Sequence, residues 1–380
     1  MRPISSSTTT SRRRTARAVS VAAGWAPGAF DIPLGPSNIP VHFMRGSRTE
    51  EGMLPTTAID LEQVRLPVAD RLLAVERELR GMAPSGFEAL DEVGDYLFAR
   101  SGKLLRPTLL LLANGVGGRP SPDAVKLGAI VELLHVATLV HDDAVDHSAR
   151  RRGRPTVNHR WTHQVAIIAG DYLYSRAVIE VVALGRLEQV ALLADTANRM
   201  TIGEMRQLVL HDGLDFTRDD YERLCEHKTA SLMSAACELG TLSGAPQYRD
   251  ALREYGHHLG MAFQIVDDLL DYSSSTRVMG KPRGQDLQEH KVTLPLIAAL
   301  PKMEWGERRA VEGLFADPEP SPEAVREILD LVEAHGGVET AREEARSRAD
   351  RARDRLRRLP ASPCLEALSL AVDYVVERVR

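Results

Sequence analysis

The stretch ELLHVATLVHDDAVD, residues 132–146, decides the fold, and GMAFQIVDDLLD, residues 260–271, repeats its ending. Each is a long apolar run that ends in the pattern Asp-Asp-x-x-Asp, beginning at Asp142 and at Asp267. The first and last aspartates of each pattern are four residues apart, so they share one face of a helix. The sequence therefore predicts two buried helices, each ending in a cluster of carboxylates.

Carboxylates crowded at the end of an apolar helix need cations. Mg²⁺ is favoured, because it prefers hard oxygen ligands and shares them with phosphate and water. One such pattern alone is more often a solvated helix end or a cap, but two copies in matching apolar settings favour metal binding. The predicted metal ligands are Asp142, Asp143, Asp146, Asp267, Asp268 and Asp271.

Basic residues accompany both patterns. The stretch SGKLLRP places Lys103 and Arg106 three residues apart, RRGRPT begins at Arg151, and GKPRGQD carries Lys281. Arginine forks bind phosphate in a planar, bidentate geometry. Each basic group alone is typical of ordinary surface charge. Together with the carboxylates, they indicate one diphosphate held through metal and a second anion held without it.

These linked motifs, together with AGDYL, HKTASL around Lys228 and GKPRGQDLQEHKVTLP, resemble the trans-isoprenyl diphosphate synthases, also called polyprenyl synthetases. The resemblance covers residues 60–380. This chain departs from the family at Ser101-Gly102, where Gly-Gly is commoner, and at Glu289-His290-Lys291, where Glu-Gly-Lys is commoner. Neither departure removes a charged ligand. The resemblance implies an all-α fold, a large single-domain helical bundle around a deep central cavity.

The same resemblance implies a prenyltransferase that condenses isopentenyl diphosphate with an allylic diphosphate, using three Mg²⁺ ions per active site. Asp142, Asp146 and Asp267 would bind metal, with Asp143 and Asp271 in support directly or through water. The residues implied for the allylic diphosphate are Arg151, Lys228 and Lys281. Those implied for isopentenyl diphosphate, without metal, are Lys103, Arg106, His135 and Arg152. The catalytic centre would comprise Lys228, Thr229, Phe263 and Gln264.

Some of these residues have a structural alternative. A lone histidine in an apolar helix, such as His135, is usually a satisfied core residue, although its place in the motif favours substrate binding. Thr229 can serve only as a helix hydroxyl bonded to the backbone. Lys291 is a further candidate for diphosphate contact, or simply the partner of a neighbouring acid.

Product length is expected to depend on the helix that carries the first aspartate pattern. In the family, the growing chain descends along this helix, and Thr138 lies about 6 Å before Asp142 at ~1.5 Å rise per residue. Thr138 and its neighbour Ala137 are small. They favour a medium- or long-chain polyprenyl diphosphate. The alternative is a plug at Leu134 or on another helix, which would leave a geranylgeranyl or farnesyl diphosphate synthase.

Rival functions fit these motifs less well. A terpene cyclase of related fold would carry one Asp-Asp-x-x-Asp pattern and a later Asn/Ser/Glu triad. A squalene- or phytoene-type synthase would lack the set Lys103, Arg106 and Arg152. A non-catalytic partner subunit of a heteromeric synthase typically loses one aspartate cluster, and this chain keeps both. A homodimer is the expected assembly.

Composition sets the remaining limits. The chain has 380 residues, 43% of them hydrophobic, so it can bury a large single core. Its net charge of −5 argues against a general nucleic-acid binder. The three cysteines predict no disulfide framework, and the sequence indicates no apolar stretch of membrane-spanning length, which together favour a cytoplasmic enzyme.

Residues 1–57 differ in kind from residues 58–380, the expected catalytic domain. They are rich in Arg, Ser, Thr, Pro and Gly, and this composition predicts a disordered extension, of which residues 1–52 are expected to be dispensable. A transit peptide has a similar composition, and Met44 or Met53 is an alternative start. From Leu61 onward apolar residues recur at spacings of three and four, which predicts helices throughout.

Overall fold

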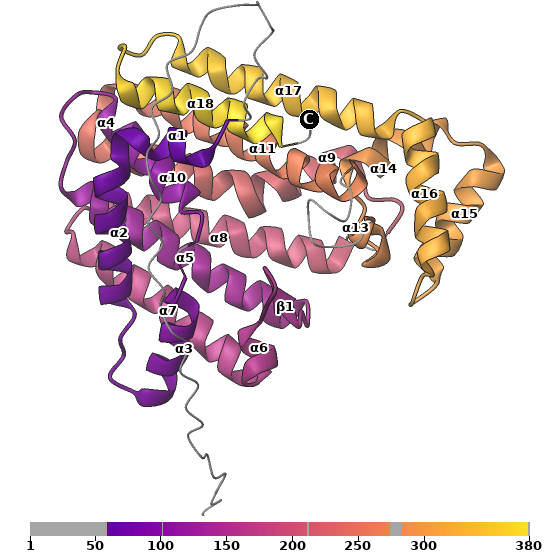
Figure 1. Ribbon diagram of the computed structural model, residues 1–380, viewed down its shortest axis with the longest axis horizontal. Helices are drawn as coiled ribbons and strands as arrows, with labels where there is room; N and C mark the ends of the chain where they lie inside the picture. Colours follow the sequence, from indigo (N-terminus) through magenta and orange to yellow (C-terminus); the bar gives the residue numbers. More distant parts are fainter. Residues whose placement is uncertain (1–58, 101, 211–212, 274–282, 379–380) are drawn as a thin grey trace, which may run out of the picture. The chain divides into compact units, whose positions relative to one another are not determined.

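The computed structural model describes residues 59–100, 102–210, 213–273 and 283–378. The chain divides into two compact units, residues 1–55 and 56–380, and the described residues all belong to the second. The predicted N-terminal extension, residues 1–57, lies outside the described residues and stays a prediction. The first half of the second unit contains α1 (Leu61–Arg65), α2 (Ala69–Met82), α3 (Glu88–Phe98), α4 (Leu105–Gly115), α5 (Asp123–Val145), β1 (Arg150–Arg151), β2 (Arg154–Pro155), α6 (Val157–Arg160), α7 (His163–Ala183) and α8 (Leu187–Leu210) (Figure 1).

The second half contains α9 (Arg218–Cys225), the π-helical turn η2 (Glu226–Ala230), α10 (Ser231–Gly244), α11 (Arg249–Ser273), α13 (Gln285–Gln288), α14 (Leu294–Ala299), α15 (Trp305–Ala316), α16 (Pro322–Ala334), α17 (Gly337–Leu356) and α18 (Pro363–Glu377). Three short 3₁₀ turns, η1 (Leu66–Val68), η3 (Pro246–Tyr248) and η4 (Leu300–Lys302), join neighbouring helices. The prediction of an all-α fold is confirmed.

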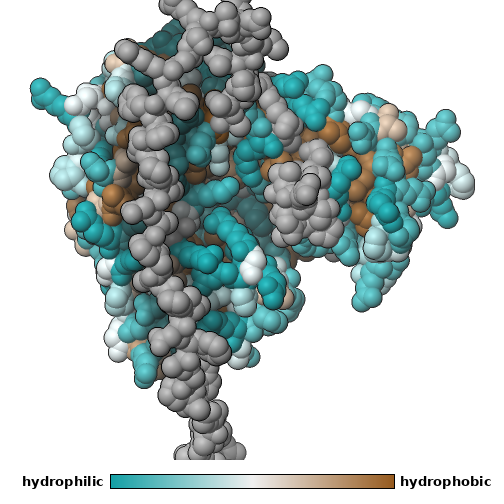
Figure 2. Space-filling model, viewed as in Figure 1, coloured by the Kyte–Doolittle hydropathy of each residue, from teal (hydrophilic) through white to brown (hydrophobic). Residues whose placement is uncertain are grey.

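Helix α5 lies at the centre of the bundle. It packs against α7 on one side and against α2, α4 and α10 on others. Ile130, Leu133 and Leu134 are buried, as expected for a run that is apolar nearly all round. Helix α11, which carries the second aspartate pattern, packs against α10 and α17. On the face seen in Figure 2, hydrophilic residues cover most of the described surface.

One expectation about α5 is wrong. By length and composition this helix would suffice to cross a membrane, because its most apolar window has a mean hydropathy of 1.5. The sequence interpretation found no stretch of that length. However, 61% of that window is buried inside the bundle, and the core helix of a folded domain meets the same criteria.

A short hairpin interrupts the helices between α5 and α6. Strands β1 and β2 pair antiparallel, with Arg151 opposite Arg154. Arg152 and Gly153 form the turn and both have positive φ, 50° and 76°. Two positive φ values are what a tight two-residue hairpin turn requires. Two-residue strands leave no periodic signal in a sequence, so the hairpin was not expected.

Candidate active site

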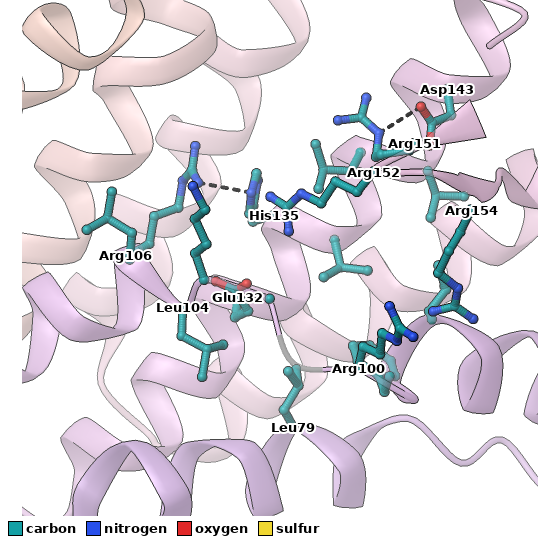
Figure 3. A pocket seen from close by; sticks show the side chains of 18 of the residues that line it. Leu79, Arg100, Leu104, Arg106, Glu132, His135, Asp143, Arg151, Arg152 and Arg154 are labelled. Carbon is teal, nitrogen blue, oxygen red and sulfur yellow. Dashed lines mark hydrogen bonds and ion pairs between the residues drawn. The ribbon is translucent and has the colours of Figure 1, made fainter. Parts of the chain in front are cut away.

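A cavity of about 340 Å³ opens beside the end of α5 that carries the first aspartate pattern (Figure 3). Residues of α2, α3, α4, α5, α11 and α18 and of the hairpin line it. Its wall is rich in cations: Arg80, Arg100, Lys103, Arg106, Arg151, Arg152 and Arg154. The wall therefore favours an anionic ligand.

The four residues predicted to hold isopentenyl diphosphate all line this cavity. Lys103 lies just before α4 and Arg106 in its first turn, while His135 is in the middle of α5 and Arg152 at the tip of the hairpin. Just before α4, Leu104 has a left-handed conformation, with φ 42° and ψ 33°. This conformation is rare for a residue with a Cβ and marks a locally strained turn. It lies between Lys103 and Arg106.

Arg106 and His135 form a close pair. Arg106 Nη1 lies 2.9 Å from His135 Nε2. Burial, and then the positive charges of Arg106, Arg151 and Arg152, hold the pKa of His135 well below its ordinary value. The imidazole is therefore neutral at pH 7, and its Nε2 accepts the hydrogen bond from the guanidinium. The positive charge of the pair stays on Arg106.

Glu132 also lines this cavity, and the sequence interpretation missed it. It lies on α5 three residues before His135 and is 6% exposed. Burial raises its pKa, while Arg106, Arg152 and Arg65 act in the opposite direction. A glutamate in an otherwise apolar helix was the only available signal.

The hairpin places Arg151 against the first aspartate pattern. Arg151 Nε donates a hydrogen bond to Asp143 Oδ1 at 2.8 Å (Figure 3). Asp143 is buried, with 7% exposure. Arg151, predicted for the allylic diphosphate, thus lies directly against a predicted metal ligand.

Side chains of the π-helical turn η2 contact both aspartate-bearing helices, α5 and α11. Lys228 Nζ lies 4.0 Å from Asp142 Oδ2 on α5. On the other side of η2, Thr229 Oγ1 donates a hydrogen bond to Gln264 Oε1 on α11 at 2.6 Å. Single π-turns inside helices occur frequently at functional sites. The predicted catalytic residues Lys228, Thr229 and Gln264 are therefore brought together.

Lys228 also contacts two residues of α8 that the sequence interpretation missed. Its Nζ lies 2.8 Å from Glu204 Oε2 and donates a hydrogen bond to Gln207 Oε1 at 2.7 Å. These residues are three apart, so they share one face of α8. Phe263, the fourth predicted catalytic residue, lines the cavity, and the guanidinium of Arg378 lies 5.1 Å from its ring centre.

The six predicted metal ligands differ in their surroundings. Burial raises the pKa of Asp142 to about 7, and Glu204 and Asp146 add to this while Lys228 opposes it. Asp267 Oδ1 accepts a hydrogen bond from Arg378 Nη2 at 3.2 Å. Asp271 accepts from the backbone N–H groups of Gln285 and Asp286, at 3.1 and 2.9 Å.

Among the residues that the structure describes, no group of three or more His, Cys, Asp or Glu side chains is arranged to hold a metal ion. The two aspartate patterns lie on separate helices, and several of their carboxylates are bonded to protein groups. Metal binding by the six aspartates therefore stays a prediction. Lys281 lies outside the described residues, and so does its predicted contact with the allylic diphosphate.

The two residues predicted to control product length do not line the main cavity. Ala137 is buried, and Thr138 Oγ1 donates a hydrogen bond to the carbonyl oxygen of His135 at 2.8 Å. Leu134, one turn further from Asp142, instead borders a separate apolar cavity of about 30 Å³ between α5, α7 and α8. Tyr174 of α7 borders the same cavity.

Residues 87–332 match the family model described as polyprenyl synthetase. The all-trans-nonaprenyl-diphosphate synthase of Rhodobacter capsulatus is 35% identical over 326 residues, 85% of this chain and all of that protein. The octaprenyl diphosphate synthase of Escherichia coli is 33% identical with the same coverage. A short chain isoprenyl diphosphate synthase of Methanothermobacter thermautotrophicus is 34% identical over 80% of this chain and 95% of that protein.

The chain belongs to the polyprenyl synthetase family. It is a prenyltransferase of that family. The fold agrees: a polyprenyl synthase from Caulobacter crescentus, solved with calcium and isoprenyl diphosphate, superposes with a TM-score of 0.80 at 31% identity, covering 86% of this chain and all of that one.

Proposed function

We propose that this polyprenyl synthetase joins isopentenyl diphosphate to an allylic diphosphate and elongates the product to a medium- or long-chain all-trans polyprenyl diphosphate. The observation that carries the proposal is the cation-lined cavity beside the first aspartate pattern, because it contains Lys103, Arg106, His135 and Arg152 together. In the cavity, the forked guanidinium groups of Arg106 and Arg152 suit the diphosphate of isopentenyl diphosphate. Relatives named for long products support the length.

The allylic diphosphate would lie between the two aspartate-bearing helices. We propose that Arg151, Lys228 and Lys281 contact its phosphates and that Mg²⁺ ions link it to Asp142, Asp146 and Asp267. These residues fit such ions, because their carboxylates are hard oxygen donors. A bound cation would also stabilise the ionised form of Asp142, which burial disfavours. When bound, the ions act as Lewis acids that neutralise the leaving diphosphate. We propose three Mg²⁺ ions per active site.

Product length has a second candidate, favoured by one observation. Leu134 and Tyr174 border a cavity of only about 30 Å³, roughly the liquid volume of one water molecule. An isoprene unit does not fit there unless these side chains move. If they form a fixed floor, the product is of geranylgeranyl or farnesyl length. If they yield, the small residues Ala137 and Thr138 let the chain pass.

We also propose that the enzyme is a homodimer and acts in the cytoplasm. Support for the dimer comes from α7 and α8, which carry many large apolar side chains that are exposed: Ile167, Ile168, Tyr174, Val178, Ile179, Val182, Leu187, Ile202, Met205, Leu208 and Val209. Exposed apolar patches of this kind commonly mark protein interfaces.

One incubation tests the main proposal. The full chain is supplied with labelled isopentenyl diphosphate, an allylic primer and Mg²⁺, and the dephosphorylated products are separated by chromatography. We expect products longer than geranylgeranyl, and no product when the metal is chelated. Asp142→Ala and Asp267→Ala should each lower turnover by orders of magnitude while circular dichroism stays helical.

Other outcomes have defined meanings. A geranylgeranyl or farnesyl product would support the fixed floor at Leu134. No turnover by the chain alone, with turnover restored by a second family member, would indicate a partner subunit. Near-normal turnover in either alanine variant would exclude the two-cluster arrangement.

A further inference from the structure

Four side chains, one of them Asp268 of the second aspartate pattern, form a continuous hydrogen-bonded chain. Tyr221 Oη donates to Asp268 Oδ2 at 2.5 Å, Gln264 Nε2 donates to Asp268 Oδ1 at 2.8 Å, and Thr229 Oγ1 donates to Gln264 Oε1 at 2.6 Å. The chain runs from α9 through α11 to η2. Tyr221, Asp268 and Thr229 are buried, at 2%, 8% and 6% exposure.

The donors and acceptors in this chain fix one another. A carboxylate only accepts, so the NH₂ end of the Gln264 amide faces Asp268 and its oxygen faces Thr229. Each oxygen of Asp268 accepts from a protein donor. Reversing the amide would place its oxygen against the carboxylate and its NH₂ against the Thr229 hydroxyl, losing the bond to Asp268.

Asp267, the adjacent residue, has a different environment. One residue on a helix turns the side chain through about 100°, so neighbouring carboxylates in one pattern point in different directions. The side chain of Asp267 is 54% exposed, whereas Asp268 faces the interior towards α9. Asp268 and Gln264 are four residues apart and share one face of α11.

We propose that Asp268 and Tyr221 are positioning residues for prenyl transfer and that Asp268 is not a metal ligand. Tyr221 holds Asp268, Asp268 orients the Gln264 amide, and the amide places the Thr229 hydroxyl beside Lys228. The proposal rests on the function proposed above for this site. It separates the second aspartate pattern into a residue that faces the site, Asp267, and a residue that organises the interior, Asp268.

Three variants test the division: Asp267→Asn, Asp268→Asn and Tyr221→Phe. Mn²⁺ binding is measured by calorimetry on the full chain in the presence of inorganic diphosphate, a readout that needs no turnover. We expect Asp267→Asn to weaken Mn²⁺ binding at least about tenfold. Asp268→Asn and Tyr221→Phe should leave it within about twofold while lowering kcat about tenfold, with KM for isopentenyl diphosphate unchanged. The kcat losses of Tyr221→Phe and Asp268→Asn should also fail to multiply in the double variant, because both break one chain.

A matched control removes a buried tyrosine hydroxyl elsewhere. Tyr255 is fully buried on α11, and its hydroxyl donates to the carbonyl oxygen of Leu368 at 2.7 Å. Tyr255→Phe should lower Tm about as much as Tyr221→Phe but leave kcat unchanged. Equal kcat losses in the two tyrosine variants would reduce Tyr221 to a general stability role.

Two results would overturn the proposal: Mn²⁺ binding weakened as much in Asp268→Asn as in Asp267→Asn, or full kcat in Tyr221→Phe. An inactive wild-type chain would count against the proposed function instead. The Mn²⁺ comparison would still decide whether Asp268 is a ligand.

Discussion

At the scale of single residues, the site depends on polar groups that the apolar core of α5 would not tolerate alone. Glu132 and His135 are both in this helix. His135 contacts Arg106, and the charge of Arg106 acts on the pKa of Glu132. Burying an unpaired charge is costly, so such groups occur where partners compensate them. Here the neutral His135 accepts a hydrogen bond from Arg106, and the charge of Arg106 opposes the rise that burial causes in the pKa of Glu132. On our proposal, the positive charge that stays on Arg106 is available to the diphosphate of isopentenyl diphosphate.

The low pKa of His135 predicts a pH dependence of stability. Below about pH 6.5 the unfolded chain binds a proton at this position that the folded chain does not, so stability falls as pH falls and is fully present above that pH. His135→Gln removes the titrating group. Relative to its own value at pH 7.5, the wild type should lose about 1.4 kcal/mol more unfolding free energy at pH 5.5 than the variant does.

Denaturant unfolding at the two pH values measures this difference, and other titrating groups cancel in the comparison. Parallel losses in wild type and variant would mean that His135 becomes protonated in the folded state at pH 5.5.

At the scale of elements, periodicity predicted the parts of the site that lie on long helices. The two aspartate patterns lie at the ends of α5 and α11, as their spacing predicted, and Lys103, Arg106, Arg151 and Arg152 of the basic motifs line the cavity. Contacts between distant segments left no such signal. Tyr221 meets Asp268 across 47 residues, and Lys228 meets Gln207 across 21. Such partners are set by how helices pack, which one sequence does not encode locally.

The stripe of α5 through Asp142, Thr138 and Leu134 is where product length is decided on our proposal. Residues four apart are displaced by only about 40° around a helix and about 6 Å along it. Thr138→Phe should therefore block the path and shift the main product to about three or four isoprene units, since close-packed surroundings leave a phenyl ring little room. Ala137→Phe should act in the same direction. Leu134→Ala should lengthen the product if Leu134 and Tyr174 form the floor.

Product chromatography with a fixed primer detects shorter as well as longer products. The two Phe variants and Leu134→Ala therefore serve as controls for one another. The first condensation should stay fast in the Phe variants. An unchanged product distribution in all three variants would place the path along another helix.

At the scale of the molecule, the composition predicted a large single core and the apolar periodicity predicted helices, but neither indicated which apolar side chains would be exposed. Helix α7 buries Ala166, Leu173 and Ala177 against the bundle while Ile168 and Ile179 are 58% and 54% exposed. A helix that is apolar on opposite faces is expected to be covered on both. From the sequence, the same residues were indistinguishable from core, because an apolar pattern does not say whether the covering surface belongs to the same chain.

This second apolar face predicts the assembly. Ile168→Glu combined with Ile179→Glu places two charges in the surface that a partner subunit would cover, and burying an unpaired carboxylate opposes association. We expect light scattering coupled to size-exclusion chromatography to give a dimer for the wild type and a monomer for the double variant. Leu73→Glu is the control, because Leu73 is an equally exposed leucine on α2, with 60% exposure, outside α7 and α8. It should leave the dimer intact. A double variant with the mass of the wild type would show that α7 is not the interface, and its apolar face would then need another partner.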